Sequence, residues 1–168
     1  MKIFSELCGL LRVSAALFAA GLAATALAAD TSAVEQGTAP ACRVVILSGL
    51  PGSPVLARRF SDWSARFRAY CVDKAGIPAP QILTLSGDAA AQPKPATAEA
   101  VLNALADLAT RTATADPFIL YIIGHGDTAD GEATLALPGR DLRISELAAA
   151  LARLPSEKQV VLHFGAAS

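Results

Sequence analysis

The sequence predicts an α/β fold: a three-layer sandwich in which a mainly parallel sheet, with strand order 2-1-3-4, lies between helices. Short apolar runs rich in Val, Ile and Leu recur along the chain, and segments with helical periodicity lie between them. Strand and helix alternation of this kind is typical of parallel sheets joined by right-handed crossovers. The 168 residues provide enough chain for one core of ordinary size.

Four apolar runs are predicted to form the sheet. They contain little polar alternation, which indicates strands buried on both faces, as parallel strands usually are. The runs are residues 43–48 (RVVILS), 81–85 (QILTL), 118–123 (FILYII) and 159–164 (QVVLHF). Residues 134–137 and 141–144 flank Pro138 and Gly139 and predict a small β-hairpin.

Three helices are predicted from capping residues and apolar spacing. Ser53 followed by Pro54 is typical of an N-cap and first turn, and Gly76 and Pro78 end the helix that follows. Its apolar face, which we expect to pack on the sheet rather than on a partner, carries Leu56, Phe60, Trp63, Phe67 and Cys71. We expect Thr97 to cap a helix over 98–111, and Ser145 to cap one that carries Leu147, Leu151 and Leu154.

Residues 1–28 are predicted to be a cleavable signal peptide. Lys2 and Arg12 precede an uncharged run over 13–29, which closes on the small residues of the segment 26–28 (ALA). The run is short for a membrane span, which needs about 20 apolar residues, although an uncleaved signal anchor is the alternative. We therefore expect an exported protein, periplasmic or secreted, with a flexible lead-in at 29–41 and the folded domain at 42–168.

Charge and composition exclude some partners. The whole chain has a formal charge of −1, and Lys2, Glu6 and Arg12 together contribute +1, so removal of the signal leaves −2. A nearly neutral chain with mixed charges predicts no nucleic-acid partner. We also expect no membrane span after signal cleavage and no cofactor, while a peptide or protein partner fits this composition.

The cysteines predict a disulfide. Cys8 leaves with the signal, so Cys42 and Cys71 remain as a pair in an oxidising compartment. A helix that follows a parallel strand runs back along it, which should bring Cys71 near the start of the strand at Cys42. The alternative is two buried thiols.

His125 is the leading candidate for chemistry. It follows the strand 118–123, and sites of open α/β sheets lie at the carboxyl ends of strands. Gly124 and Gly126 flank it, and a histidine there suits general-base work because its ordinary pKa lies near neutrality. The alternative is a histidine that only hydrogen-bonds within a loop.

Other candidates are weaker. A metal site from His125, Asp127, Asp130 and His163 has no spacing signature, so we expect no metal, and we interpret His163 as a core histidine. Ser48 and Ser86, which end or follow the first two strands, are interpreted as turn residues.

The segments follow the order RVVILSG, an amphipathic helix, FILYIIGHGD, a further helix and QVVLHF. This order of segments resembles the caspase and haemoglobinase fold of caspases, legumain and gingipains. The resemblance implies that His125 and Gly126 match the catalytic His-Gly pair, with the Gly126 N–H in an oxyanion hole. It also implies a cysteine nucleophile just after the fourth strand, where this sequence has Gly165.

The segments GHGD, ALPGRDL and LARLP resemble an exported bacterial branch of this fold that lacks the cysteine motif. The family fold carries further strands after the fourth, so the resemblance implies a partial domain. Without a thiolate, a cysteine-peptidase mechanism has no attacking atom.

These observations lead to three hypotheses. The first is an exported caspase-like domain that binds a peptide or protein without cleaving it. The second is a hydrolase that uses His125 as base with a hydroxyl nucleophile, for which the terminal Ser168 is a weak candidate, or with residues absent from this chain. The third is an exported α/β module whose activity the sequence does not reveal.

Overall fold

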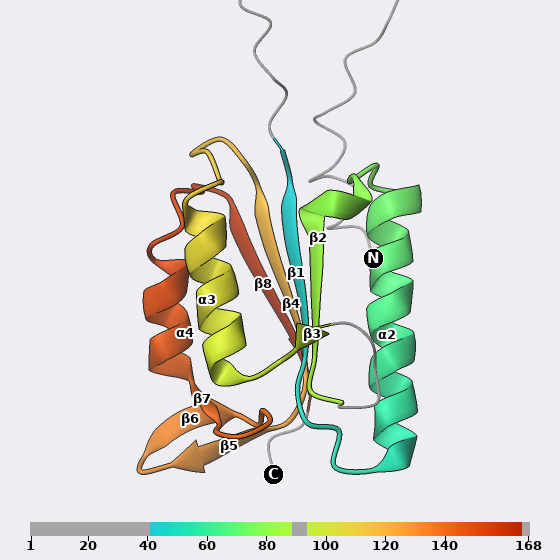
Figure 1. The fold of residues 1–168 in the computed structure, drawn as a ribbon, viewed down its shortest axis with the longest axis vertical. Coiled ribbons are helices and arrows are strands. Elements are labelled where there is room, and N and C mark those ends of the chain that lie inside the picture. The colour runs from blue at the N-terminus through green and yellow to red at the C-terminus, as the bar shows by residue number, and fades with distance from the viewer. Residues whose placement is uncertain (1–40, 89–93, 166–168) are drawn as a thin grey trace, which may run out of the picture. The chain divides into compact units, whose positions relative to one another are not determined.

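The computed structural model describes residues 41–88 and 94–165. In this part of the chain a five-stranded parallel sheet has the order β3-β2-β1-β4-β8. Helix α2 covers one face of the sheet, and α3 and α4 cover the other (Figure 1). The predicted α/β class with a mainly parallel sheet between helices is confirmed.

The sheet and its helices have the following bounds. The strands are β1 (Arg43–Ser48), β2 (Ile82–Ser86), β3 (Lys94–Pro95), β4 (Phe118–Ile123) and β8 (Gln159–Phe164). The helices are α2 (Pro54–Asp73), α3 (Ala98–Ala109) and α4 (Ile144–Leu151), with a 3₁₀ turn at Ala79–Gln81. The predicted strands at 43–48, 118–123 and 159–164 have these bounds, while β2 lies one residue later than predicted and α3 ends two residues earlier.

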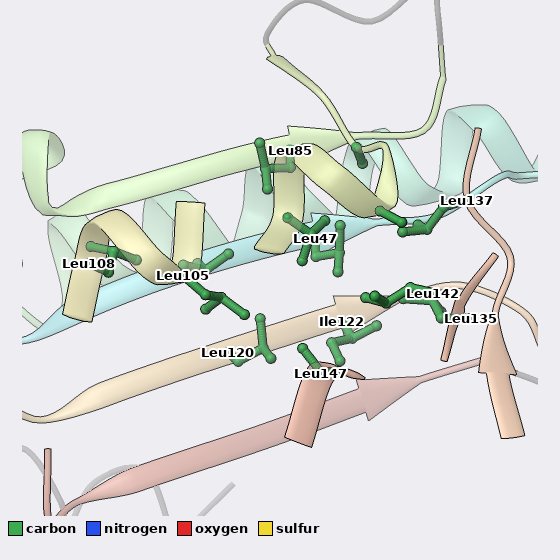
Figure 2. Packing of buried hydrophobic residues seen from close by; sticks show 14 of the residues in the cluster. Leu47, Leu85, Leu105, Leu108, Leu120, Ile122, Leu135, Leu137, Leu142 and Leu147 are labelled. Carbon is green, nitrogen blue, oxygen red and sulfur yellow. The ribbon is translucent and has the colours of Figure 1, made fainter. Parts of the chain in front are cut away.

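Two groups of apolar side chains hold the layers together, one on each face of the sheet. The larger joins the sheet to α3 and α4 and includes Leu47, Leu85, Leu105, Leu120 and Leu147 (Figure 2). The smaller lies toward α2 and consists of Val44, Ile46, Cys71, Ile77 and Ile82. Alternate side chains of one strand reach opposite faces, which is why β1 and β4 contain so little polar sequence.

The caps predicted for α2 and α3 are confirmed. The Ser53 hydroxyl accepts a hydrogen bond from the Leu56 N–H at 3.3 Å, and the Thr97 hydroxyl accepts one from the Ala100 N–H at 3.1 Å. The apolar face of α2 is only partly buried, however. Phe60 and Cys71 are buried, whereas Trp63 is 41% exposed.

The cap predicted for α4 is wrong. The helix begins at Ile144, so Ser145 is inside the first turn and Arg143 is the N-cap. Carboxylates satisfy the first N–H groups instead: Glu146 accepts from the Arg143 N–H at 3.2 Å, and Glu132 accepts from the Ser145 N–H at 3.1 Å. Since Glu132 lies on a neighbouring strand, the local pattern could not show this cap.

A second, antiparallel sheet follows β4. It contains β5 (Gly126–Ala129), β6 (Glu132–Leu135) and β7 (Leu142–Arg143). The predicted hairpin corresponds to β6 and β7, with shifted bounds, whereas β5 was missed because it carries no apolar pattern. Asp130 and Gly131 turn β5 into β6 with φ of 52° and 78°.

The predicted signal peptide at 1–28 lies outside the described residues, as does nearly all of the lead-in at 29–41. The last residue of that lead-in, Ala41, donates its N–H to the buried Asp116 carboxylate at 2.7 Å. Within the described residues, no helix has the length and apolar character that crossing a membrane requires.

Candidate functional site

His125 lies directly after β4, at the carboxyl edge of the sheet, and is partly buried. Its ring packs against the ring of Phe60 from α2, with 5.7 Å between centroids and 37° between planes. No carboxylate or hydroxyl among the described residues hydrogen-bonds its imidazole. Packing against Phe60, rather than a hydrogen-bonded acid, therefore orients this side chain.

Backbone hydrogen bonds fix the chain on both sides of His125. The Gly124 N–H donates to the Phe164 carbonyl at 3.0 Å, and the His125 carbonyl accepts from the Ala136 N–H at 3.0 Å. Gly49, at the end of β1, donates to the Ile123 carbonyl at 2.8 Å. A Cβ on Gly49 would come within 2.6 Å of the Ala136 carbonyl oxygen, so this crossing of backbones requires glycine.

Gly165, where the caspase resemblance implies a cysteine nucleophile, has no room for a side chain. A Cβ built on Gly165 would overlap the carbonyl oxygen of Gly124 and would lie 3.1 Å from Nε2 of His163. An attacking sulfur at this position would require the backbone to move. Ser168, the weak hydroxyl candidate, lies outside the described residues.

Gly126 is the first residue of β5 rather than part of a loop, and it pairs with Leu135 of β6. Sequence reasoning missed this strand, and with it the fact that the His-Gly pair connects the main sheet to the antiparallel one. The antiparallel sheet therefore positions the backbone that follows His125.

The candidate metal ligands do not come together. The Asp127 carboxylate accepts from the Thr128 N–H at 2.6 Å, and Asp130 forms a long ion pair of 3.8 Å with Arg143. Among the described residues there is no group of three or more His, Cys, Asp or Glu side chains that could hold a metal ion. The interpretation of His163 as a core residue is wrong: its side chain is exposed, and β8 is the last strand on that side of the sheet among the described residues.

Cys42 and Cys71 contribute to the same apolar packing beside α2. Cys71 is buried in the group that contains Val44 and Ile46, and the partly buried Cys42 packs against that group. No disulfide joins the two sulfurs in the described structure. Their placement agrees with the expected approach of the helix end to the start of β1.

The serines at the ends of β1 and β2 contact each other and the neighbouring backbone. The Ser48 hydroxyl lies 3.5 Å from the Leu85 carbonyl oxygen and 3.4 Å from the Ser86 hydroxyl, and all three residues are buried. Ser86 in turn accepts from the Asp88 N–H at 3.2 Å. These contacts support the interpretation of Ser48 and Ser86 as residues that shape the turns.

An exposed apolar surface lies along β8, next to the His125 segment. Val161 is 48% exposed and Phe164 is 52% exposed. On the α2 face, the Phe164 ring lies 5.4 Å from that of Tyr121, which stacks on Phe67 at 4.1 Å. Burial also raises the pKa of Tyr121.

On the opposite face, a hollow of about 230 Å³ opens beside β8. Apolar side chains from β4, β6 and α4 line it together with Val161 and His163. In the part of the chain that the structure describes, both faces of β8 thus combine apolar side chains with an unpaired strand edge. Such an edge presents backbone N–H and C=O groups that a further strand can pair with.

Comparison with known proteins adds no identification: no protein-family model matches the chain, and neither does any curated protein.

Proposed function

We propose that this chain is an exported protein with a caspase-like domain that binds an extended segment of a protein partner and does not cleave it. The observation that carries the proposal is the outer edge of β8 within the described residues, where the partner segment would take the place that a further strand has in the complete caspase fold. In the described part of the chain β8 is the last strand on its side of the sheet, and it pairs only with β4.

Binding at this edge would use the backbone of β8 for affinity and its side chains for selection. An extended peptide that adds to a sheet forms main-chain hydrogen bonds, and its alternate side chains enter pockets on the two faces. Here one face offers the hollow beside Val161 and His163, and the other offers the Phe164 and Tyr121 rings. Because successive side chains of a strand point to opposite faces, a peptide with apolar residues at consecutive positions fits both faces.

Two features support binding without cleavage. Gly165 leaves no space for a nucleophile next to Gly124. His125 has an aromatic neighbour rather than a carboxylate or hydroxyl partner among the described residues. A general base that has no oriented nucleophile within hydrogen-bond reach lacks the geometry of nucleophilic catalysis.

The test is binding of the purified protein to an array of short random peptides, with Val161→Lys as the probe variant. A lysine at the centre of an edge strand opposes strand addition. Val55→Lys is the matched control, because Val55 is 52% exposed but belongs to α2 rather than to β8. We expect peptides with three or more consecutive apolar residues to bind the wild type and Val55→Lys, and to lose about tenfold or more in affinity for Val161→Lys.

Mass spectrometry of the same peptides separates binding from hydrolysis. We expect them to stay intact after incubation with the wild type and with His125→Ala. Cleavage by the wild type that His125→Ala abolishes would contradict the proposal in favour of the hydrolase hypothesis. Equal affinity for Val161→Lys and Val55→Lys would show that β8 is not the binding edge.

A further inference from the structure

A cavity of about 270 Å³ lies between α2 and the carboxyl ends of β1 and β2. It is separate from the β8 edge and lies behind Phe60, whose ring contacts His125. Hydroxyl groups from three elements line it: Ser48 belongs to the end of β1, Thr84 and Ser86 to β2, and Ser61 and Ser64 to α2. In open α/β sheets, small-molecule sites lie beyond the carboxyl ends of strands.

The space between α2 and the sheet changes from apolar to polar along the strands. Near Cys71 it is filled by Ile46 and Ile82. Beyond them, toward the carboxyl ends of the strands, the side chains become polar. Thr84 is the β2 residue in register with Ile46, and Ser86 is in register with Ser48. The helix changes in the same way, since Ser64 is a buried serine at a position where α2 packs on the sheet.

Two hydroxyls of the cavity have no hydrogen-bond partner among residues 41–88 and 94–165. Ser64 is only 9% exposed, and neither its Oγ nor Oγ1 of Thr84 forms a hydrogen bond within the described residues. A buried hydroxyl without a partner costs folding free energy, so such groups are usually satisfied by water or a ligand. A polar molecule in the cavity would satisfy both.

Opposite charges also reach the cavity. Arg68 lies one turn beyond Ser64 on α2 and is partly buried, and Asp88 follows β2. Among the described residues, no carboxylate lies within ion-pair distance of Arg68. A partly buried guanidinium without a nearby carboxylate favours a ligand that carries a carboxylate. Asp88 favours a ligand that also carries a positive group.

We propose that this cavity binds a free α-amino acid with a polar side chain. The ligand carboxylate pairs with Arg68, and its ammonium group lies toward Asp88. Its side chain hydrogen-bonds to the hydroxyls of Ser64 and Thr84. The site is independent of peptide binding at β8, because none of these residues lies on that edge.

Isothermal titration calorimetry of the purified protein tests the proposal with L-serine, L-threonine and L-glutamine. Ethanolamine and 3-hydroxypropionate are the matched probes, since each lacks one of the two charged groups of serine. We expect saturable binding of at least one amino acid. Both matched probes should bind with an affinity at least about tenfold lower than that amino acid.

Arg68→Gln should weaken amino-acid binding about tenfold or more, because it removes the cation while keeping a polar side chain. Arg66→Gln is the matched control on α2, since Arg66 is exposed and does not line the cavity. Circular dichroism establishes that both variants are folded. Absence of saturable heat for all three amino acids at millimolar concentration, or equal binding by the two variants, would overturn the proposal and leave water as the occupant.

Discussion

Gly165 lies so close to Gly124 that a side chain at position 165 would overlap the Gly124 carbonyl oxygen. The backbone of Gly124 is held in place, because the residue is buried and its N–H donates to the Phe164 carbonyl at 3.0 Å. The residue that follows β8 is therefore restricted to glycine, at the position where the resemblance implies a catalytic cysteine. This relationship makes the lack of a nucleophile a property of the backbone as well as of the sequence.

Gly165→Cys should lower the free energy of unfolding by about 1–3 kcal/mol, because the new Cβ forces the backbone apart. It should not create peptidase activity. Urea denaturation and a peptide cleavage assay measure the two effects, with Ala69→Cys on the exposed side of α2 as control. A stable Gly165→Cys protein that cleaves peptides only when His125 is intact would contradict this prediction.

Asp116→Asn should destabilise the protein by about 1–3 kcal/mol. The buried Asp116 carboxylate accepts from the Ala41 N–H at 2.7 Å and from the Ala113 N–H at 3.0 Å. Asparagine would direct an NH₂ group at one of these donors and leave it unpaired. Thermal denaturation should show this loss, whereas the exposed control Asp141→Asn should behave as the wild type. Equal loss in both variants would assign the effect to net charge instead.

Arg140→Gln should reduce stability at neutral pH but not in acid. Arg140 donates to Glu146 at 2.8 and 3.1 Å and to Glu99 at 2.7 Å, and these hydrogen bonds lower the pKa of both carboxyls. A lowered folded-state pKa stabilises the protein above the ordinary glutamate pKa of about 4.3, and this stabilisation is lost as the pH falls further.

The measurement for Arg140→Gln is thermal denaturation at neutral pH and at about pH 3, at low ionic strength since the groups are exposed. The difference from the wild type should be present at neutral pH and should shrink in acid. Arg153→Gln is the control, because Arg153 is exposed and forms no ion pair within the described residues. A difference that grows toward acid pH would refute the assignment.

Cys42 and Cys71 should form a disulfide in the exported protein. The two thiols would lose two electrons and two protons to the disulfide of a thiol oxidoreductase in the oxidising compartment. We expect maleimide labelling of both residues in urea-unfolded protein only after reduction, and a loss of about 2–4 kcal/mol of stability on reduction. Cys42→Ala should remove the dependence on reductant. Unchanged labelling before and after reduction would show that the two cysteines are buried thiols.

Cleavage of the signal peptide should give a mature N-terminus near Ala29. The measurement is the intact mass of the protein recovered from outside the cytoplasm of an expressing bacterium. A mass that includes residues 1–28, in protein that fractionates with membranes, would favour the uncleaved signal anchor. This prediction concerns residues that lie outside the described part of the chain.

The elements that sequence patterns predicted well are those whose causes are local. The run at 118–123 forms β4 because its six apolar or aromatic residues, with Pro117 before them and Gly124 after them, have the length and composition of a strand covered on both faces. Ser53 and Thr97 cap their helices through residues three positions away. Ser145 failed as a cap because the competing acceptor, Glu132, belongs to a strand that the pattern alone did not define.

The sequence by itself determined the α/β class, the main strands and the position of His125 at a carboxyl edge, because these follow from apolar runs, helical spacing and turn residues. Only the tertiary structure decided that His163 is exposed, that Gly165 meets Gly124, and that Ser64 and Thr84 share a cavity. The physical reason is distance along the chain. Burial, steric overlap and unpaired hydroxyls depend on which remote segments pack together, and no local pattern records those neighbours.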